Sequence, residues 1–312
     1  MKIILVNTSS FSVINKELIH CMKKKGYYFH FNEYKRKLSK QELINRINKD
    51  VVAAIAGTES WDKEVLLNAE NISVISRCGV ATDNIDIEFT KKNGIKVLNT
   101  EDAPSQAVAE LSLALILSSL RKIHDSCSKM KEGIWLKQNG SLLHGKTLGI
   151  IGFGRIGKIL YNLLVPFEMK ILIFDPCYYG PHKTNNFNDL ISCSDVITLH
   201  VPLTSTTKNI ISSSEFNIMK KNIVLINLSR GGVVNENDLF NFLEVNLEAY
   251  AALDVFETEP YTGKLQTLKN IILTPHIGSY AKESRDQMEK DALCSLFNAL
   301  NLKNQSELVR EI

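Results

Sequence analysis

The sequence lacks the cysteine spacings that stabilise small secreted folds or bind structural metals. Its six cysteines are scattered along 312 residues, with no C-x-x-C pair and no Cys/His spacing of the zinc type. It also lacks a charge imbalance, because 37 basic and 34 acidic residues leave a formal charge of +3 and form no basic stripe interleaved with aromatics. We therefore expect a reducing compartment, no metal and no nucleic-acid partner.

Long apolar runs are missing as well. The most apolar stretch, Leu111–Leu117, is interrupted by Ser112 and flanked by Arg121, whereas a bilayer span requires about 20 apolar residues. We expect a buried helix there and no membrane partner. At the amino terminus, the run Ile3–Val6 is too short for a signal peptide and fits a first buried strand. Together these absences predict a cytoplasmic protein.

The sequence does contain enough apolar material for two cores. Apolar residues make up 44% and charged residues 23%, which is the balance of a globular chain rather than a disordered or fibrous one. A chain of 312 residues is too long for one minimal core and fits two domains.

The first hundred residues alternate short β-branched runs with amphipathic segments. Lys2–Asn7, Val51–Ala56 and Ser73–Ser76 have strand patterns, whereas Lys16–Lys25 and Lys63–Ala69 have helical ones. This alternation predicts a parallel sheet covered by helices. We expect it to form a smaller, flavodoxin-like substrate domain.

Two crossings between the lobes are predicted. The polar sequence from Asn99 to Pro104 breaks the first alternation and precedes a long helix from Ser105 to Lys122. From Ala281 the tail is one amphipathic helix, which we expect to return to the first lobe. The predicted domains are residues 1–99 with 281–312 for the substrate (catalytic) domain, and residues 100–280 for an inserted NAD-binding domain.

A second alternating series predicts the nucleotide-binding sheet. Six apolar runs are separated by helical or loop segments: Leu148–Ile151, Ile171–Phe174, Val196–His200, Ile223–Leu228, Ala249–Val255 and Ile271–Thr274. A doubly wound parallel sheet requires such a series. The predicted fold is therefore α/β, with two Rossmann-like lobes.

A glycine pattern follows the first of these runs. Gly152, Gly154 and Gly157 stand at the spacing G-x-G-x-x-G and lead into the helical pattern Lys158–Leu164. Glycine suits a tight turn at the first position, close approach of backbone to a pyrophosphate at the second, and helix–strand packing at the third. The anion would bind at the helix N-terminus. The pattern alone is weak, but its place between a strand and a helix favours a dinucleotide site.

The next strand ends at an acidic residue, Asp175, 18 residues after Gly157. A carboxylate there accepts hydrogen bonds from ribose hydroxyls and repels a 2′-phosphate. No basic residue follows directly, since the next residues are Pro176 and Cys177. We therefore expect NAD rather than NADP as the cofactor.

Three later segments carry charged or titratable residues at strand ends, where open α/β sheets bind ligands. They are Asn227–Gly232, Leu253–Pro260 and Thr274–Gly278. With these segments, Arg77–Asp86, Ala107–Glu110, the glycine pattern and His200–Thr204, nearly the whole chain resembles the D-isomer-specific 2-hydroxyacid dehydrogenase family. The phosphoglycerate dehydrogenase branch is the most similar. Because the sequence continues only briefly after the last helix, we expect no appended regulatory domain.

Chemistry assigns roles to three residues in these segments. Moving a hydride at C2 of a hydroxy acid requires a proton transfer at the attached oxygen, a step that suits a histidine side chain, and His276 is the candidate. Glu259 would orient the imidazole and stabilise its protonated form. Arg230 offers a planar fork of donors for the substrate carboxylate and keto oxygen. We predict these three residues as the catalytic set.

The resemblance implies further binding residues. Beside the three glycines and Asp175, the implied cofactor contacts are Arg155, Ile156, His200, Val201, Pro202, Thr207, Leu228, Ser229, Arg230, Asp254, His276, Gly278 and Ser279. Asp254 would reach the nicotinamide amide. The substrate would contact Arg77, Arg230 and the backbone amides of Gly79, Val80 and Ala81, where Ala81 departs from an expected glycine.

The substrate stays open between several small acids. Arg77 keeps 3-phosphoglycerate possible, and glyoxylate, hydroxypyruvate or a larger keto acid are alternatives. A formate dehydrogenase of the same fold is disfavoured by the acid at position 259, where that branch has glutamine. A second class of protein, a dehydrogenase-like module that senses NAD without turnover, is distinguished by activity. We also predict a homodimer, because the apolar helix Val108–Leu120 presents Leu and Ile on more than one face.

Overall fold

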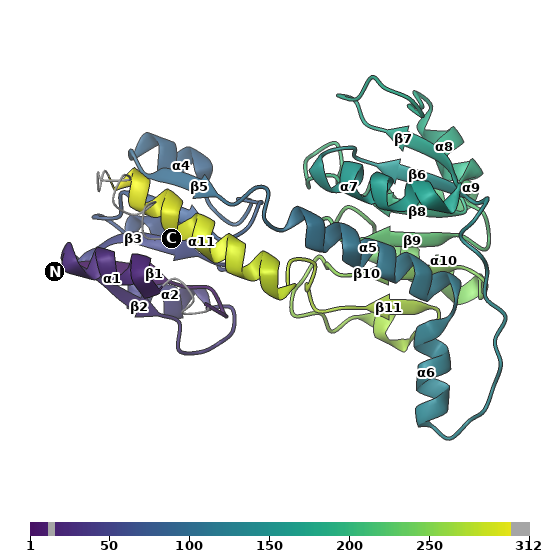
Figure 1. Cartoon of the computed structure of the whole chain (residues 1–312), viewed down its shortest axis with the longest axis horizontal. Helices are drawn as coiled ribbons and strands as arrows, with labels where there is room; N and C mark the ends of the chain where they lie inside the picture. Colours follow the sequence, from purple (N-terminus) through teal and green to yellow (C-terminus); the bar gives the residue numbers. More distant parts are fainter. Residues whose placement is uncertain (12–15, 301–312) are drawn as a thin grey trace. The chain divides into compact units, whose positions relative to one another are not determined.

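The computed structural model describes residues 1–11 and 16–300 (Figure 1). The chain forms two compact units, one of Met1–Pro104 with the segment that begins at Ala281, and one of Ser105–Tyr280. The first boundary was predicted after residue 99 and lies after Pro104, where the long helix begins. Residues 301–312 of the predicted substrate domain lie outside the described residues.

The first unit is built on a five-stranded parallel sheet in the order β2-β1-β3-β4-β5. The strands are β1 (Lys2–Val6), β2 (Tyr27–Phe31), β3 (Val51–Ala56), β4 (Val74–Arg77) and β5 (Lys96–Asn99). The helices are α1 (Lys16–Lys24), α2 (Lys40–Arg46), α3 (Lys63–Leu67), α4 (Ile87–Lys92) and α11 (Lys282–Ala299). This strand order is the flavodoxin-like one, with the reversal between β1 and β3.

Both faces of this sheet are covered. Ile3 and Leu5 enter a cluster with α2 and α3, whereas Ile4 and Val6 enter a second cluster with α1 and α11. Alternate side chains of β1 thus serve opposite faces, which explains why the strand is apolar throughout. The carboxyl-terminal helix α11 contacts β3, β4 and β5, and Ser76 Oγ donates to its Ala292 carbonyl over 2.9 Å.

The second unit is built on a six-stranded parallel sheet in the order β11-β10-β9-β8-β6-β7. Its strands are β6 (Thr147–Ile151), β7 (Lys170–Phe174), β8 (Val196–Leu199), β9 (Val224–Asn227), β10 (Tyr250–Leu253) and β11 (Ile271–Leu273). Its helices are α5 (Ser105–Leu120), α6 (Ile123–Lys131), α7 (Arg155–Leu164), α8 (Phe187–Cys193), α9 (Ser213–Ile218) and α10 (Glu236–Val245). The strand order reverses between β6 and β8, which marks the place where such sheets bind nucleotides.

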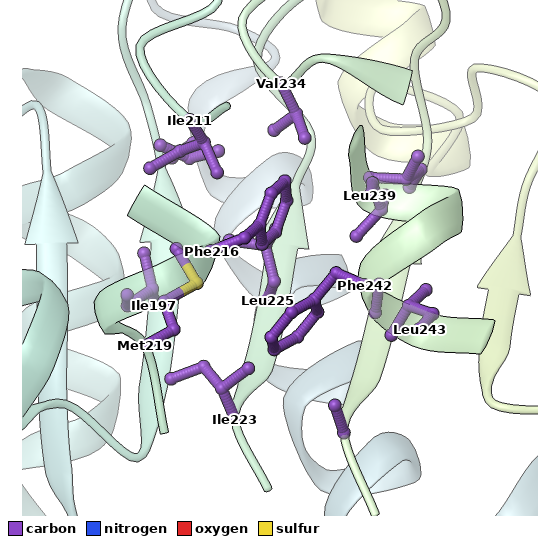
Figure 2. Packing of buried hydrophobic residues seen from close by; sticks show 14 of the residues in the cluster. Ile197, Ile211, Phe216, Met219, Ile223, Leu225, Val234, Leu239, Phe242 and Leu243 are labelled. Atoms are coloured by element: carbon purple, nitrogen blue, oxygen red, sulfur yellow. The ribbon is translucent and has the colours of Figure 1, made fainter. Parts of the chain in front are cut away.

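The second sheet is also enclosed between two helical layers. On one face α8, α9 and α10 pack on the strands, and the rings of Phe216 and Phe242 stack there with centroids 4.9 Å apart (Figure 2). On the other face α5 and α7 pack against each other and on the sheet. The predicted doubly wound architecture is therefore confirmed.

Helix α5 buries most of the apolar side chains on which the predicted dimer rests. It lies against α7, β9, β10 and β11, and only Leu111, Leu113 and Leu117 among its leucines and isoleucines are partly exposed (Figure 1). Large apolar side chains are instead exposed on α6 and in the segment after it: Ile123, Met130, Ile134, Trp135, Leu136 and Leu142. Within the described ranges, no helix is both long and apolar enough to span a bilayer.

Candidate active site

The glycine turn lies at the point where the strand order reverses. Gly152 has φ +90°, and a Cβ there would lie 2.6 Å from the His200 carbonyl oxygen at the end of β8. A Cβ on Gly157 would lie 2.5 Å from the Gly152 oxygen, so helix α7 packs directly on the turn. Both positions therefore require glycine, for conformation and for contact respectively.

Gly154 differs from its two neighbours in the pattern. It caps α7 with φ −74°, an ordinary value, and no atom lies within 4 Å of a Cβ built on it. The space beside the first turn of α7 is thus open, and the start of a helix is where backbone N–H groups can bind an anion. This cradle fits the pyrophosphate of a dinucleotide.

Asp175 follows β7, beside the same turn. Its Oδ2 accepts from the Phe153 N–H over 2.7 Å, and its Oδ1 accepts from the Cys177 N–H over 2.7 Å. The two backbone bonds fix the carboxylate next to the glycine turn. The predicted contact of Asp175 with the ribose hydroxyls would have to be made beside these two bonds and stays a prediction.

His200 and Thr207 lie on the β8 side of the turn. The His200 ring bonds Thr198 Oγ1 over 2.9 Å through Nε2, and within residues 1–11 and 16–300 its buried Nδ1 has no hydrogen-bond partner. Burial lowers the pKa of His200 to about 4. Thr207 Oγ1 donates to the Pro202 carbonyl over 2.5 Å, which holds the loop of Val201 and Pro202 in place.

Arg230 is placed by a turn after β9. Asn227 Oδ1 accepts from the N–H of Ser229 over 3.0 Å and from its hydroxyl over 2.7 Å, and Asn227 Nδ2 donates to the Arg230 carbonyl over 3.0 Å. The Arg230 guanidinium donates to the Ser229 carbonyl over 2.6 Å. Asn227 was not among the predicted residues, although it begins the segment that was singled out.

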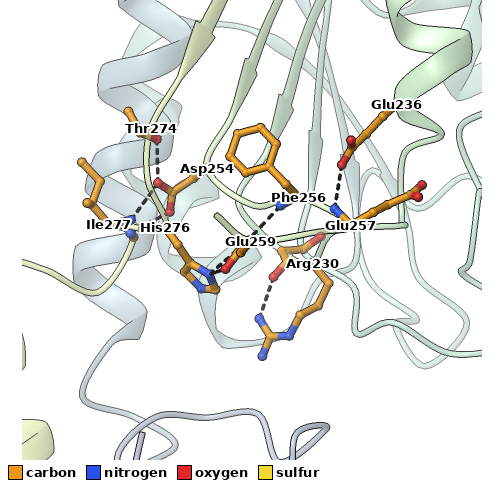
Figure 3. Close-up of polar contacts among 11 residues, drawn as sticks. Arg230, Glu236, Asp254, Phe256, Glu257, Glu259, Thr274, His276 and Ile277 are labelled. Carbon is orange, nitrogen blue, oxygen red and sulfur yellow. Dashed lines mark hydrogen bonds and ion pairs between the residues drawn. The ribbon is translucent and has the colours of Figure 1, made fainter. Parts of the chain in front are cut away.

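His276 and Glu259 form a pair, although they follow different strands. His276 Nδ1 lies 2.9 Å from Glu259 Oε2, and Glu259 Oε1 accepts from the Phe256 N–H over 3.1 Å (Figure 3). Their side chains are 40% and 32% exposed, so a small molecule can reach the imidazole. Because Nδ1 faces the carboxylate, Nε2 is the ring nitrogen that can exchange a proton with a substrate.

Asp254 is buried behind this pair. Its Oδ1 accepts from the Thr274 hydroxyl over 2.6 Å and the Ile277 N–H over 2.8 Å, and its Oδ2 accepts from the Gly278 N–H over 2.7 Å. Burial raises the pKa of Asp254, and these bonds oppose that rise. The carboxylate thus supports the turn on which His276 has φ +55°. The predicted contact with a nicotinamide amide would have to be made beside these three bonds.

The predicted substrate loop belongs to the first unit. The Gly79 N–H donates to Thr100 Oγ1 over 2.8 Å, so its predicted contact with a substrate carboxylate would have to be made beside this bond. Among the described residues, the N–H groups of Val80 and Ala81 have no partner. Ala81 lies outside the positive-φ region, so the replacement of an expected glycine causes no backbone strain. Gly79 has φ +146°, and the Arg77 guanidinium lies against it, with Nη1 2.5 Å from an added Cβ.

Comparison with known proteins identifies the family. Residues 113–278 match the model of the D-isomer specific 2-hydroxyacid dehydrogenase NAD-binding domain. The chain belongs to this family. A hydroxypyruvate reductase of Thermotoga maritima is 37% identical over 85% of this chain and 90% of its own. A glyoxylate reductase of Thermococcus litoralis is 41% identical over 79% of each.

Other members of the 2-hydroxyacid dehydrogenase family match over different lengths. A D-3-phosphoglycerate dehydrogenase of Methanocaldococcus jannaschii is 40% identical over 80% of this chain, but the match spans only 49% of its own length. The crystal structure of the NAD⁺-bound 3-phosphoglycerate dehydrogenase of Entamoeba histolytica aligns with a TM-score of 0.83 and 26% identity, over 96% of this chain and 95% of that one. The predicted family, fold and cofactor class are confirmed.

Proposed function

We propose that this 2-hydroxyacid dehydrogenase family member transfers a hydride between NAD and C2 of a small D-2-hydroxy or 2-keto acid. The observation that carries the proposal is the His276–Glu259 pair, 2.9 Å apart, on the same sheet as the glycine turn and Asp175. All of these residues follow the carboxyl ends of parallel strands in the second unit, the edge at which such sheets bind ligands.

When bound, the nicotinamide supplies or accepts the hydride. His276 holds a proton on Nε2 and gives it to the keto oxygen during reduction, or takes it from the hydroxyl during oxidation. Glu259 stabilises the positive charge that the imidazole carries before it gives the proton in reduction and after it takes the proton in oxidation. The Arg230 guanidinium extends to the same side as the imidazole, where it would bind the substrate carboxylate (Figure 3).

The geometry favours this reaction over the two alternatives. Formate oxidation moves no proton at oxygen and has no need of a carboxylate behind the histidine, yet Glu259 lies within hydrogen-bond distance of His276. An NAD-sensing module would have no need of an accessible proton donor. The exposed fraction of the His276 side chain, 40%, supports an enzyme.

The substrate is an organic acid of small size. The Arg77 guanidinium lies against Gly79, in the loop that continues to Val80 and Ala81, and its positive charge supports an anionic ligand at that loop. The named relatives divide between reductases of glyoxylate or hydroxypyruvate and dehydrogenases of 3-phosphoglycerate. We therefore keep 3-phosphoglycerate and the two unphosphorylated keto acids as candidates.

The test is turnover with a panel of acids. Glyoxylate, hydroxypyruvate, pyruvate and 3-phosphoglycerate are assayed with NADH or NAD⁺ and, in parallel, with NADPH or NADP⁺. His276→Ala should lose at least about 10²-fold in kcat while NADH still binds. His124→Ala, on the exposed surface of α6, is the matched control and should keep full activity. Binding of NADH without turnover on any acid would contradict the proposal and indicate a sensing module.

We also propose a homodimer in the cytoplasm. Ile134, Trp135 and Leu136 are consecutive exposed apolar residues, Trp135 with 80% of its surface exposed, and a second copy would cover them. The six cysteines are unpaired, which is typical of a reducing compartment. Light scattering should give twice the mass of one chain at micromolar concentration, and Trp135→Ser with Leu136→Ser should lower it.

A further inference from the structure

The loop that carries Arg230 packs against one peptide group of the loop that carries Glu259. The Phe256–Glu257 peptide lies against Gly231, where an added Cβ would be only 2.0 Å from the Phe256 carbonyl carbon. On its other side the Glu257 N–H donates to Glu236 Oε1 over 2.6 Å. The preceding N–H, of Phe256, donates to Glu259 Oε1. Successive backbone amides are therefore held by two carboxyl groups.

Glu236 is well placed to hold this peptide. It is the first residue of α10 and is half-buried, and the helix has its own cap in Asn235, whose Oδ1 accepts from the Asp238 N–H over 3.0 Å. The Glu236 carboxyl is therefore not needed as the cap. It reaches across to the loop after β10 instead, as Figure 3 shows.

The surroundings of Glu236 are acidic. Glu257, Glu259 and Tyr261 face it from the loop after β10, and Asp238 follows on its own helix, where it accepts from the Ser213 N–H. Burial raises the pKa of Glu236, and the charges of Glu257 and Glu259 raise it further, against the bond from the Glu257 N–H. The repulsion among the carboxylates of Glu236, Glu257 and Glu259 costs free energy unless a positive charge close by offsets it. The protonated imidazole of His276, which Glu259 contacts, would supply this positive charge.

We propose that Glu236 is a positioning residue for the His276–Glu259 pair. Its carboxyl holds the Phe256–Glu257 peptide, and the neighbouring Phe256 N–H orients the Glu259 carboxylate. Its negative charge stabilises the protonated imidazole of His276. This inference rests on the proposed function, in which His276 exchanges the proton.

The two parts of the proposal are separated by two substitutions. Glu236→Gln keeps an oxygen that accepts from the Glu257 N–H but removes the charge, whereas Glu236→Ala removes both. Glu244→Gln is the matched control, because it removes one exposed carboxylate from the same helix. In the full-length protein, NMR follows the His276 ring signal against pH, assigned by its loss in His276→Ala. Steady-state kinetics give kcat and the KM for NADH.

In Glu236→Gln the midpoint of His276 titration should fall by about 0.3–0.5 pH unit, with kcat at the optimum within about threefold of wild type. In Glu236→Ala kcat should fall about tenfold at an unchanged KM for NADH, because the pair loses alignment. A midpoint in Glu236→Gln equal to that of the Glu244→Gln control would overturn the proposal, even if Glu236→Ala fails to fold. The NMR titration decides this without turnover, so an inactive wild type would remove the proposed function and still leave Glu236 tested.

Discussion

His276 Nδ1 lies 2.9 Å from Glu259 Oε2, although 17 positions separate the two residues in the chain. Glu259 belongs to the loop after β10 and His276 to the turn after β11, and these two strands are neighbours in the sheet. Parallel neighbours end at the same edge, so the sheet itself brings the carboxylate and the imidazole together.

The Glu259→Gln variant should remove the negative charge of this side chain while keeping its position. The amide oxygen can still accept from the Phe256 N–H, but the imidazolium at His276 loses its counter-charge. We expect kcat for keto-acid reduction to fall by about 10–100-fold and the alkaline limb of its pH profile to move to lower pH. Glu244→Gln, which removes an exposed carboxylate from α10, is the control. An unshifted limb in Glu259→Gln would contradict the assigned role.

Alanine substitutions at two glycines of the turn should affect different properties, stability at Gly157 and NADH binding at Gly154. Gly157→Ala brings a methyl group within 2.5 Å of the Gly152 oxygen and should lower the free energy of unfolding by about 1–3 kcal/mol. Gly154→Ala meets no atom within 4 Å and should leave stability unchanged while weakening NADH binding about tenfold or more. Urea unfolding and NADH fluorescence titration measure the two effects. Equal loss of stability in both variants would disagree with the open space at Gly154.

Asp175 should control the choice between the two nicotinamide cofactors. Asp175→Ser removes the charge that repels a 2′-phosphate, together with acceptors for the Phe153 and Cys177 amides. We expect the KM for NADH to rise about tenfold and the preference over NADPH to shrink. Asp189→Asn, exposed on α8, should change neither value. If Asp175→Ser kept the full preference for NADH, another residue would have to select the cofactor.

Asp254 should support the His276 turn more than the rest of the sheet. Asp254→Ala leaves the Ile277 and Gly278 amides without their acceptor, and we expect a loss of about 2–3 kcal/mol in the free energy of unfolding. Thr274→Val removes one of the three bonds and should cost about 1 kcal/mol. Chemical denaturation of both variants tests this order. A larger loss in Thr274→Val than in Asp254→Ala would contradict it.

His200 should make stability depend on pH. Burial lowers its pKa from the ordinary value of 6.5 to about 4 in the folded chain, so between these values the unfolded state binds the extra proton. This contribution is complete above pH 6.5 and is lost as the pH falls toward 4; between pH 8 and pH 5 the loss is about 2 kcal/mol. His200→Gln should remove that component, as measured by urea unfolding at the two pH values. His124→Gln, with an exposed ring, should retain it.

Periodicity alone identified most of the elements. The apolar runs of the second unit coincide with β6 to β11, because strands buried on both faces must be continuously apolar. The strands β2 and β5 were not predicted: β2 begins with two tyrosines and β5 contains Lys96 and Asn99, since each is an edge strand that is only partly buried. The end of the long helix was also misplaced, because Lys122 adopts φ +51° and starts α6 instead of continuing α5.

The sequence by itself determined the α/β class, the glycine turn, and the chemical character of Arg230, Glu259 and His276, because these depend on local spacing and side-chain type. Only the tertiary structure decided which groups contact one another across strands. The engagement of Gly79 by Thr100, of Asp254 by the 274–278 turn, and of the Phe256–Glu257 peptide by Gly231 and Glu236 depends on parallel strands ending side by side. No local pattern encodes those distances, since they arise from sheet order and packing.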